Sequence, residues 1–245
     1  MRRFVLVTTA ALALAACTTT MADTTPAAAD AIATAVADPL RPAADVARDP
    51  LRKPAEIIAF AGVKPGMTVI EYAPGGGYYT RLLARTVGPE GKVYALVPAA
   101  FAEREGALDA LNEMARLYGN VEVVPVDFAN FLLPEQADLA WTTENYHDFV
   151  NGGSIAAIDA QTFKALKPGG IFFVEDHDAP GTGATATRTL HRIDAEEVVR
   201  TVTAAGFTLE ARSELLNNPN DPHTGNPREV TPTSDKFALR FRKPG

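Results

Sequence analysis

The sequence EYAPGGGY at residues 71–78 decides the fold of this chain. It overlaps the end of an apolar run at residues 67–72, which predicts a buried strand, and precedes residues 79–87, which predict a helix. A strand, a glycine loop and a helix in this order give the context that a dinucleotide or nucleoside loop requires. Gly75, Gly76 and Gly77 let the backbone approach a ligand without an intervening Cβ, although the same glycines also suit a simple tight turn.

Strands and helices alternate on both sides of this loop. Further strands are expected at residues 93–97, 121–126, 137–142, 171–175, 207–215 and 236–242. Helices are expected at residues 54–61, 101–118, 154–166 and 194–205. The pattern predicts an α/β fold with a doubly wound, mostly parallel, seven-stranded Rossmann-like sheet that ends in an antiparallel C-terminal hairpin. Ligands of such sheets bind beyond the carboxyl ends of the strands, at the switch point.

The N-terminus reads as an export signal. Residues 1–16 carry Arg2 and Arg3 and then an apolar stretch, and residues 14–17 resemble the lipobox of bacterial lipoproteins. Cys17, the only cysteine, is therefore the expected lipidation site, with an ordinary cleaved signal as the alternative. We expect a periplasmic protein anchored by lipid, at the outer membrane, with a flexible tether at residues 17–45 and one domain at residues 46–245.

The charge balance limits the class of partner. The chain carries a formal net charge of −7, and removal of the signal makes it two charges more negative. Phosphate binding needs clustered Lys and Arg, and such clusters are missing from the sequence. We therefore expect a small-molecule substrate and no nucleic-acid partner.

The order of motifs resembles the class I S-adenosylmethionine-dependent methyltransferases over about residues 54–242. The motifs that carry the resemblance are Glu71 with the glycine loop, GKVYA at residues 91–95, Asp127, Asp138, LKPGG at residues 166–170, and the PGGGYYT and NYHD segments of one predicted-methyltransferase family. The resemblance implies S-adenosylmethionine as cofactor. It implies that Gly75 and Gly77 lie alongside the methionine part of this cofactor, that Glu71 supports the loop, and that Asp127 contacts the adenine amino group.

Two residues depart from the family pattern. Ala73, followed by Pro74, stands where the motif has its first glycine, which is tolerable if the backbone needs no positive φ there. Val97 stands at the end of the second strand, where the family has an acid that accepts both ribose hydroxyls. The loss of such a partner costs about 1.5 to 3 kcal/mol.

The NYHD segment after the fourth strand is the best catalytic candidate. His147 is expected to accept a proton from an attacking hydroxyl or amine, Asp148 to orient the imidazole, and Tyr146 to shape the pocket or hydrogen-bond the substrate. The alternative is that these polar residues cap the following helix or a loop. After the fifth strand, His177 lies at the same sheet edge and is a further catalytic candidate.

Three functions remain open from the sequence. The leading hypothesis is methyl transfer to a small molecule, driven mainly by positioning. A non-catalytic methyltransferase-like binding protein of the cell envelope is the alternative, and the valine at position 97 favours it. A metal-dependent hydrolase, built from His177, His191 and nearby carboxylates, is the third; no metal ligand is assigned because the residues come from separate loops. His223, in the polar loop at residues 217–235, is a candidate for a flap over the site.

Overall fold

The computed structural model describes residues 25–245 of the chain. The export signal expected at residues 1–16 and the lipidation expected at Cys17 lie outside these residues. Within residues 25–245, none of the helices combines the length and apolarity that spanning a bilayer requires.

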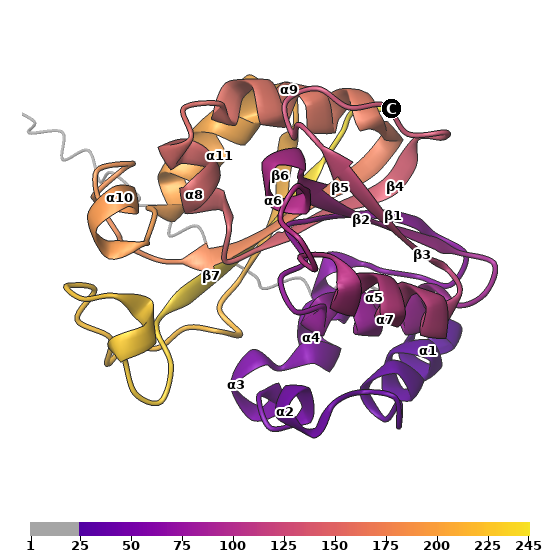
Figure 1. Cartoon of the computed structure of the whole chain (residues 1–245). Helices are drawn as coiled ribbons and strands as arrows, with labels where there is room; N and C mark the ends of the chain where they lie inside the picture. Colours follow the sequence, from indigo (N-terminus) through magenta and orange to yellow (C-terminus); the bar gives the residue numbers. More distant parts are fainter. Residues whose placement is uncertain (1–24) are drawn as a thin grey trace, which may run out of the picture.

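A seven-stranded sheet forms the centre of the molecule (Figure 1), with the strand order β3-β2-β1-β4-β5-β7-β6. The strands are β1 (Thr68–Tyr72), β2 (Lys92–Pro98), β3 (Val121–Val126), β4 (Ala137–Thr143), β5 (Leu166–His177), β6 (Thr208–Ser213) and β7 (Lys236–Arg242). The first five are parallel, while β7 runs antiparallel to both β5 and β6. The expected fold class is confirmed. The strand order reverses between β1 and β4, so ligands are expected at their carboxyl ends.

Helices cover both faces of the sheet (Figure 1). One face packs against α1 (Pro26–Val36), α4 (Pro54–Ala61), α5 (Tyr78–Val87) and α7 (Asp109–Tyr118). The other face packs against α8 (Tyr146–Asn151), α9 (Ile155–Ala165) and α11 (Ala195–Ala204). Successive residues of a strand point to opposite faces, so β2 places Val93, Ala95 and Val97 in the first core and Tyr94 and Leu96 in the second.

Short helices complete the structure. They are α2 (Ala43–Val46), α3 (Asp49–Arg52), α6 (Ala99–Ala102), α10 (Thr187–Leu190) and a 3₁₀ turn, η1 (Pro227–Glu229). The prediction of one helix over residues 101–118 is wrong for the first half of that range. Gly106 adopts a left-handed φ of 71° there, and the chain turns between α6 and α7.

The tether expected at residues 17–45 is corrected from residue 26 onward. Thr25 caps α1 by accepting a hydrogen bond from the Ala28 N–H at 3.4 Å, and Pro26 occupies the first turn. The helix buries Ala28, Ile32 and Ala35, of which the last two lie in the first core with residues of α5. The segment has few large apolar side chains, a composition typical of a linker, and this is why the sequence predicted a tether. The same small side chains let the helix pack against the domain.

Candidate functional site

The glycine loop joins β1 to α5 at the carboxyl edge of the sheet. Gly75 and Gly77 adopt φ angles of 56° and 81°, in the left-handed region that favours glycine. Gly75 and Gly76 are exposed, and a Cβ on either would meet no atom within 4 Å. The loop therefore presents bare backbone to open space, which is what a bound cofactor needs from it.

Ala73, at the start of this loop, also has a left-handed backbone, with a φ of 48°. Alanine was expected to be acceptable at this position only if the backbone needed no positive φ. The structure shows that the backbone does adopt a positive φ here. A left-handed conformation costs an L-residue about 1 to 2 kcal/mol. The Ala73 N–H donates to the Leu96 carbonyl at 2.9 Å and Asn145 Nδ2 donates to the Ala73 carbonyl at 3.4 Å, so its neighbours hold the strained conformation.

Glu71 lies in β1, two residues before the loop, and its side chain is fully enclosed. Burial raises its pKa to about 7. Its Oε2 has no hydrogen-bond partner among the described residues, whereas buried polar atoms in proteins are nearly always paired. An unpaired acceptor of this kind fits a site that a ligand completes. The support that Glu71 was expected to give the loop remains a prediction.

The two other positions expected at the cofactor differ in what they present. Val97 is only 2% exposed and points into the first core. The end of β2 therefore offers a ligand no side-chain hydrogen-bond acceptor, only backbone groups. Asp127 follows β3 and is exposed, and its Oδ1 accepts the Ala129 N–H at 2.9 Å. The acidic side chain that the family pattern has at the end of the second strand is therefore absent in the folded protein as well. Contact between Asp127 and an adenine remains a prediction.

A cavity of about 430 Å³ opens at the carboxyl ends of β4 and β5. Its walls come from α3, from α8, from the start of β7 and from the loop at residues 226–234. His147, Asp148 and His177 line it, as the sequence predicted for the catalytic edge. Residues in the range 226–234, in the second half of the polar loop at residues 217–235, line the cavity, and a flap role for this loop remains a prediction. His223 is not among the lining residues, and its Nε2 lies 2.8 Å from Asp235 Oδ2.

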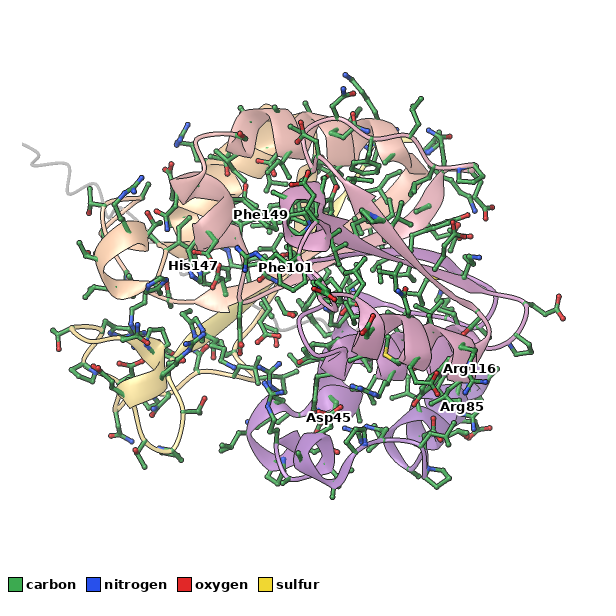
Figure 2. All side chains as sticks on the ribbon, viewed as in Figure 1. Asp45, Arg85, Phe101, Arg116, His147 and Phe149 are labelled. Atoms are coloured by element: carbon green, nitrogen blue, oxygen red, sulfur yellow. The ribbon has the colours of Figure 1, made fainter. Side chains whose placement is uncertain are left out.

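His147 is the second residue of α8 and lies beside the sheet (Figure 2), and a buried carboxylate holds its ring. Asp176 Oδ1 lies 2.9 Å from His147 Nδ1, and Asp176 Oδ2 accepts the backbone N–H of His147 at 2.8 Å. Burial lowers the pKa of His147, but its hydrogen bond to Asp176, the Asp176 charge and the nearby Asp148 and Glu144 outweigh burial and raise it. With Nδ1–H donating to Asp176, Nε2 keeps its lone pair for a ligand.

Asp148 was expected to orient His147, and this expectation is corrected. Asp176 performs that role, because it is the carboxylate within hydrogen-bond distance of Nδ1. Asp148 is 57% exposed, and its Oδ1 lies 3.5 Å from the other ring nitrogen, Nε2. The sequence held a signal for Asp176, since the EDHD segment at residues 175–178 ends β5 at the same sheet edge.

His177 is held in a different state from His147. Its Nδ1 lies 2.7 Å from Ser234 Oγ, and burial lowers its pKa to about 4. The ring is therefore neutral near pH 7. It fits the role of a hydrogen-bonding group in the cavity wall rather than a proton acceptor.

Sequence reasoning missed a charged network beside the two histidines. Glu144, the residue after β4, has a left-handed φ of 57°, and its carboxylate oxygens lie 2.8 Å from Arg52 and 2.8 Å from Lys236. Burial opposes its charge, but Lys236 and Arg52 prevail and lower its pKa below the ordinary range. Lys236 also lies 3.5 Å from the buried Glu175. No motif signals this network, because its members are far apart in the sequence.

Tyr146 does not line the cavity, so its expected role there is corrected. Its side chain is fully buried, and its hydroxyl donates to Asp159 Oδ2 at 2.7 Å and lies 2.7 Å from Thr201 Oγ1. Residues 145 and 146 begin α8, and the helical turn sends successive side chains in different directions. Tyr146 therefore points into the second core, where it ties α8 to α9 and α11.

The comparisons with known proteins agree with this architecture. No protein-family model matches the chain. A protein-L-isoaspartate O-methyltransferase of Ignicoccus hospitalis is 27% identical over 129 residues, covering 52% of this chain and 55% of the relative. The chain thus spans about half the length of that relative.

Solved structures cover more of the chain. A SAM-dependent methyltransferase from Aquifex aeolicus superposes with a TM-score of 0.60 and 20% identity, covering 87% of this chain and 97% of that one. The [4+2]-cyclase SpnF superposes with a TM-score of 0.59 and 17% identity, covering 82% and 81%. These likenesses show that the chain has the seven-stranded fold of the S-adenosylmethionine-dependent methyltransferases.

Proposed function

We propose that the chain is an S-adenosylmethionine-dependent methyltransferase that acts on a small-molecule acceptor. The observation that carries the proposal is the pairing of two sites along one sheet edge of this fold. A bare glycine loop follows β1, and a histidine oriented by a buried carboxylate faces a cavity beyond β4 and β5. The first has the form of a cofactor site and the second that of an acceptor site with a base.

The residues of the loop fit the cofactor in two respects. Gly75 and Gly76 leave room beside the backbone, and Glu71 keeps an unpaired carboxylate oxygen in the adjacent strand. When bound, S-adenosylmethionine would supply a methyl group on a sulfonium centre: in-line attack by an acceptor would form the new bond to the methyl carbon and break the sulfur–methyl bond, leaving a neutral thioether. Gly75, Gly77 and Asp127 would hold it, as the family resemblance implies.

The cavity residues perform the remaining chemistry. Asp176 holds the His147 ring through Nδ1, so that Nε2 accepts the proton of a hydroxyl or amine in the cavity as the new bond to carbon forms. The neutral His177 and the paired cations Arg52 and Lys236 orient the acceptor by hydrogen bonds and charge. Positioning supplies most of the rate enhancement in a reaction of this kind.

Calorimetric titration of the full chain with S-adenosylmethionine tests the proposal. Gly76→Val adds a side chain to the loop at a residue outside the left-handed region, and the free protein has room for it. We expect Gly76→Val to abolish the heat of binding while thermal unfolding stays close to that of the wild type. His147→Ala is expected to keep cofactor binding.

The control Gly152→Val places the same side chain at the end of α8, outside the glycine loop, and should bind cofactor like the wild type. No heat and no thermal shift at millimolar cofactor would overturn the proposal. Equal loss of binding in Gly76→Val and Gly152→Val would remove the loop assignment.

One observation favours a second candidate, a methyltransferase-like binding protein without catalysis. β2 ends in Val97 and Pro98, so it lacks the carboxylate that would accept the ribose hydroxyls, and Ala73 strains the start of the loop. The same titration decides between the two, because this candidate binds no S-adenosylmethionine.

We also propose that the chain works outside the cytoplasm, in the periplasm, anchored through Cys17. The support is the sequence of residues 1–17. Metabolic labelling with radioactive palmitate tests it: the wild type should take up label and enter the membrane fraction, and Cys17→Ala should do neither. Label in Cys17→Ala, or none in the wild type, would refute the anchor.

A further inference from the structure

We propose that His147, Asp148 and His191 form a binding site for a divalent transition-metal ion such as Zn²⁺. One donor atom from each residue lies within 4.8 Å of the donor atoms of the other two. Asp148 Oδ1 is 3.5 Å from His147 Nε2 and 3.8 Å from His191 Nδ1. The metal site does not depend on the proposed cofactor, because it is built from these three side chains alone. It shares His147 with the proposed acceptor site.

These separations suit a metal ion. Bonds of about 2.0 to 2.2 Å from zinc to imidazole nitrogen and carboxylate oxygen place tetrahedral ligands roughly 3.4 Å apart. His191 and Asp148 are 50% and 57% exposed, so small rotations of free side chains close the remaining gap. Two imidazoles and one carboxylate favour zinc and its neighbours over Mg²⁺ or Ca²⁺, which prefer oxygen.

The surroundings of the three residues have the form of a supported metal site. Metal-binding histidines usually donate their second ring N–H to a carboxylate, and His147 does so to the buried Asp176 at 2.9 Å. His191 has a left-handed φ of 53°, an uncommon backbone conformation for a residue other than glycine. The His147 and His191 rings meet edge to face, with centroids 5.6 Å apart.

The ligands line the cavity, so an ion bound by three protein groups would keep open coordination positions facing it. An oxygen donor of a cavity ligand would fill one of them. With an ion bound, Nε2 of His147 would be a ligand and would not be free to accept a proton. The ion would instead lower the pKa of a coordinated hydroxyl, so that the hydroxyl would lose its proton more readily.

Titration of the EDTA-treated full chain with Zn²⁺, followed by calorimetry, tests the site, with Co²⁺ absorption as a second readout. We expect one ion per chain. His191→Asn keeps a residue type that tolerates a left-handed backbone, and it should weaken binding at least tenfold, as should Asp148→Asn. Asp176→Asn should weaken binding about 10-fold to 100-fold, because it removes the charged partner of a ligand.

His223→Asn is the matched control. His223 also has a left-handed φ, of 56°, and also pairs with a carboxylate, Asp235, but it lies outside the cluster. It should bind Zn²⁺ like the wild type. The absence of binding, or equal weakening in His223→Asn and His191→Asn, would overturn the proposal. Titration of the same zinc-free sample with S-adenosylmethionine reports on the proposed function separately.

Discussion

Glu71→Gln should stabilise the protein, and the gain should grow with pH. Burial raises the pKa of Glu71 from its ordinary value of 4.5 to about 7. Between these values the unfolded chain releases the proton while the folded chain retains it, so folding loses stability as pH rises and the loss is complete above pH 7. At about 1.36 kcal/mol per pKa unit, the cost is about 0.8 kcal/mol at pH 5 and about 3.4 kcal/mol at pH 8.5.

Glutamine is neutral throughout this range, so Glu71→Gln removes the pH-dependent cost. Urea denaturation of both proteins at pH 5 and pH 8.5 measures it, and the difference between the two pH values cancels any constant effect of the amide. We expect the variant to gain about 2.5 kcal/mol more at pH 8.5 than at pH 5. Glu90→Gln, at an exposed turn, is the control and should show no such change. A gain that is equal at both pH values would refute the reasoning.

Two further predictions concern the cavity and the core. In the EDTA-treated protein, titration by NMR should give His177 a pKa of about 4 and His147 a pKa above its ordinary value; Asp176→Asn should lower the latter, and an unchanged value would remove Asp176 as the cause. Tyr146→Phe should cost about 1 to 3 kcal/mol of stability by urea denaturation, because it leaves the buried Asp159 without its donor, and should leave cofactor binding intact. An unchanged free energy of unfolding in Tyr146→Phe would contradict the core role that the structure gives this hydroxyl.

Much of the candidate site followed from the sequence because its parts are local. The glycine loop, the NYHD segment and the EDHD segment each lie at the carboxyl end of an apolar strand, and parallel strands bring their carboxyl ends to one edge. That rule placed His147, Asp148 and His177 together without any knowledge of contacts.

The charged network and the helix partners did not follow, because they depend on distant residues. Arg52 and Glu144 are 92 positions apart in the chain, and Tyr146 and Thr201 are 55 apart. A hydrophobic period reports which face of an element is buried, but it does not report which polar groups meet across elements.

The sequence alone determined the order of the strands along the chain, the glycine loop and the sheet edge at which ligands are expected, since these depend on hydrophobic period and turn residues. Only the tertiary structure decided that Asp176 orients His147, that Tyr146 points into the core, and that Ala73 carries a left-handed backbone. The physical reason is that packing between elements sets the direction of side chains and holds strained backbone conformations. The order of residues along the chain does not reveal which elements pack together.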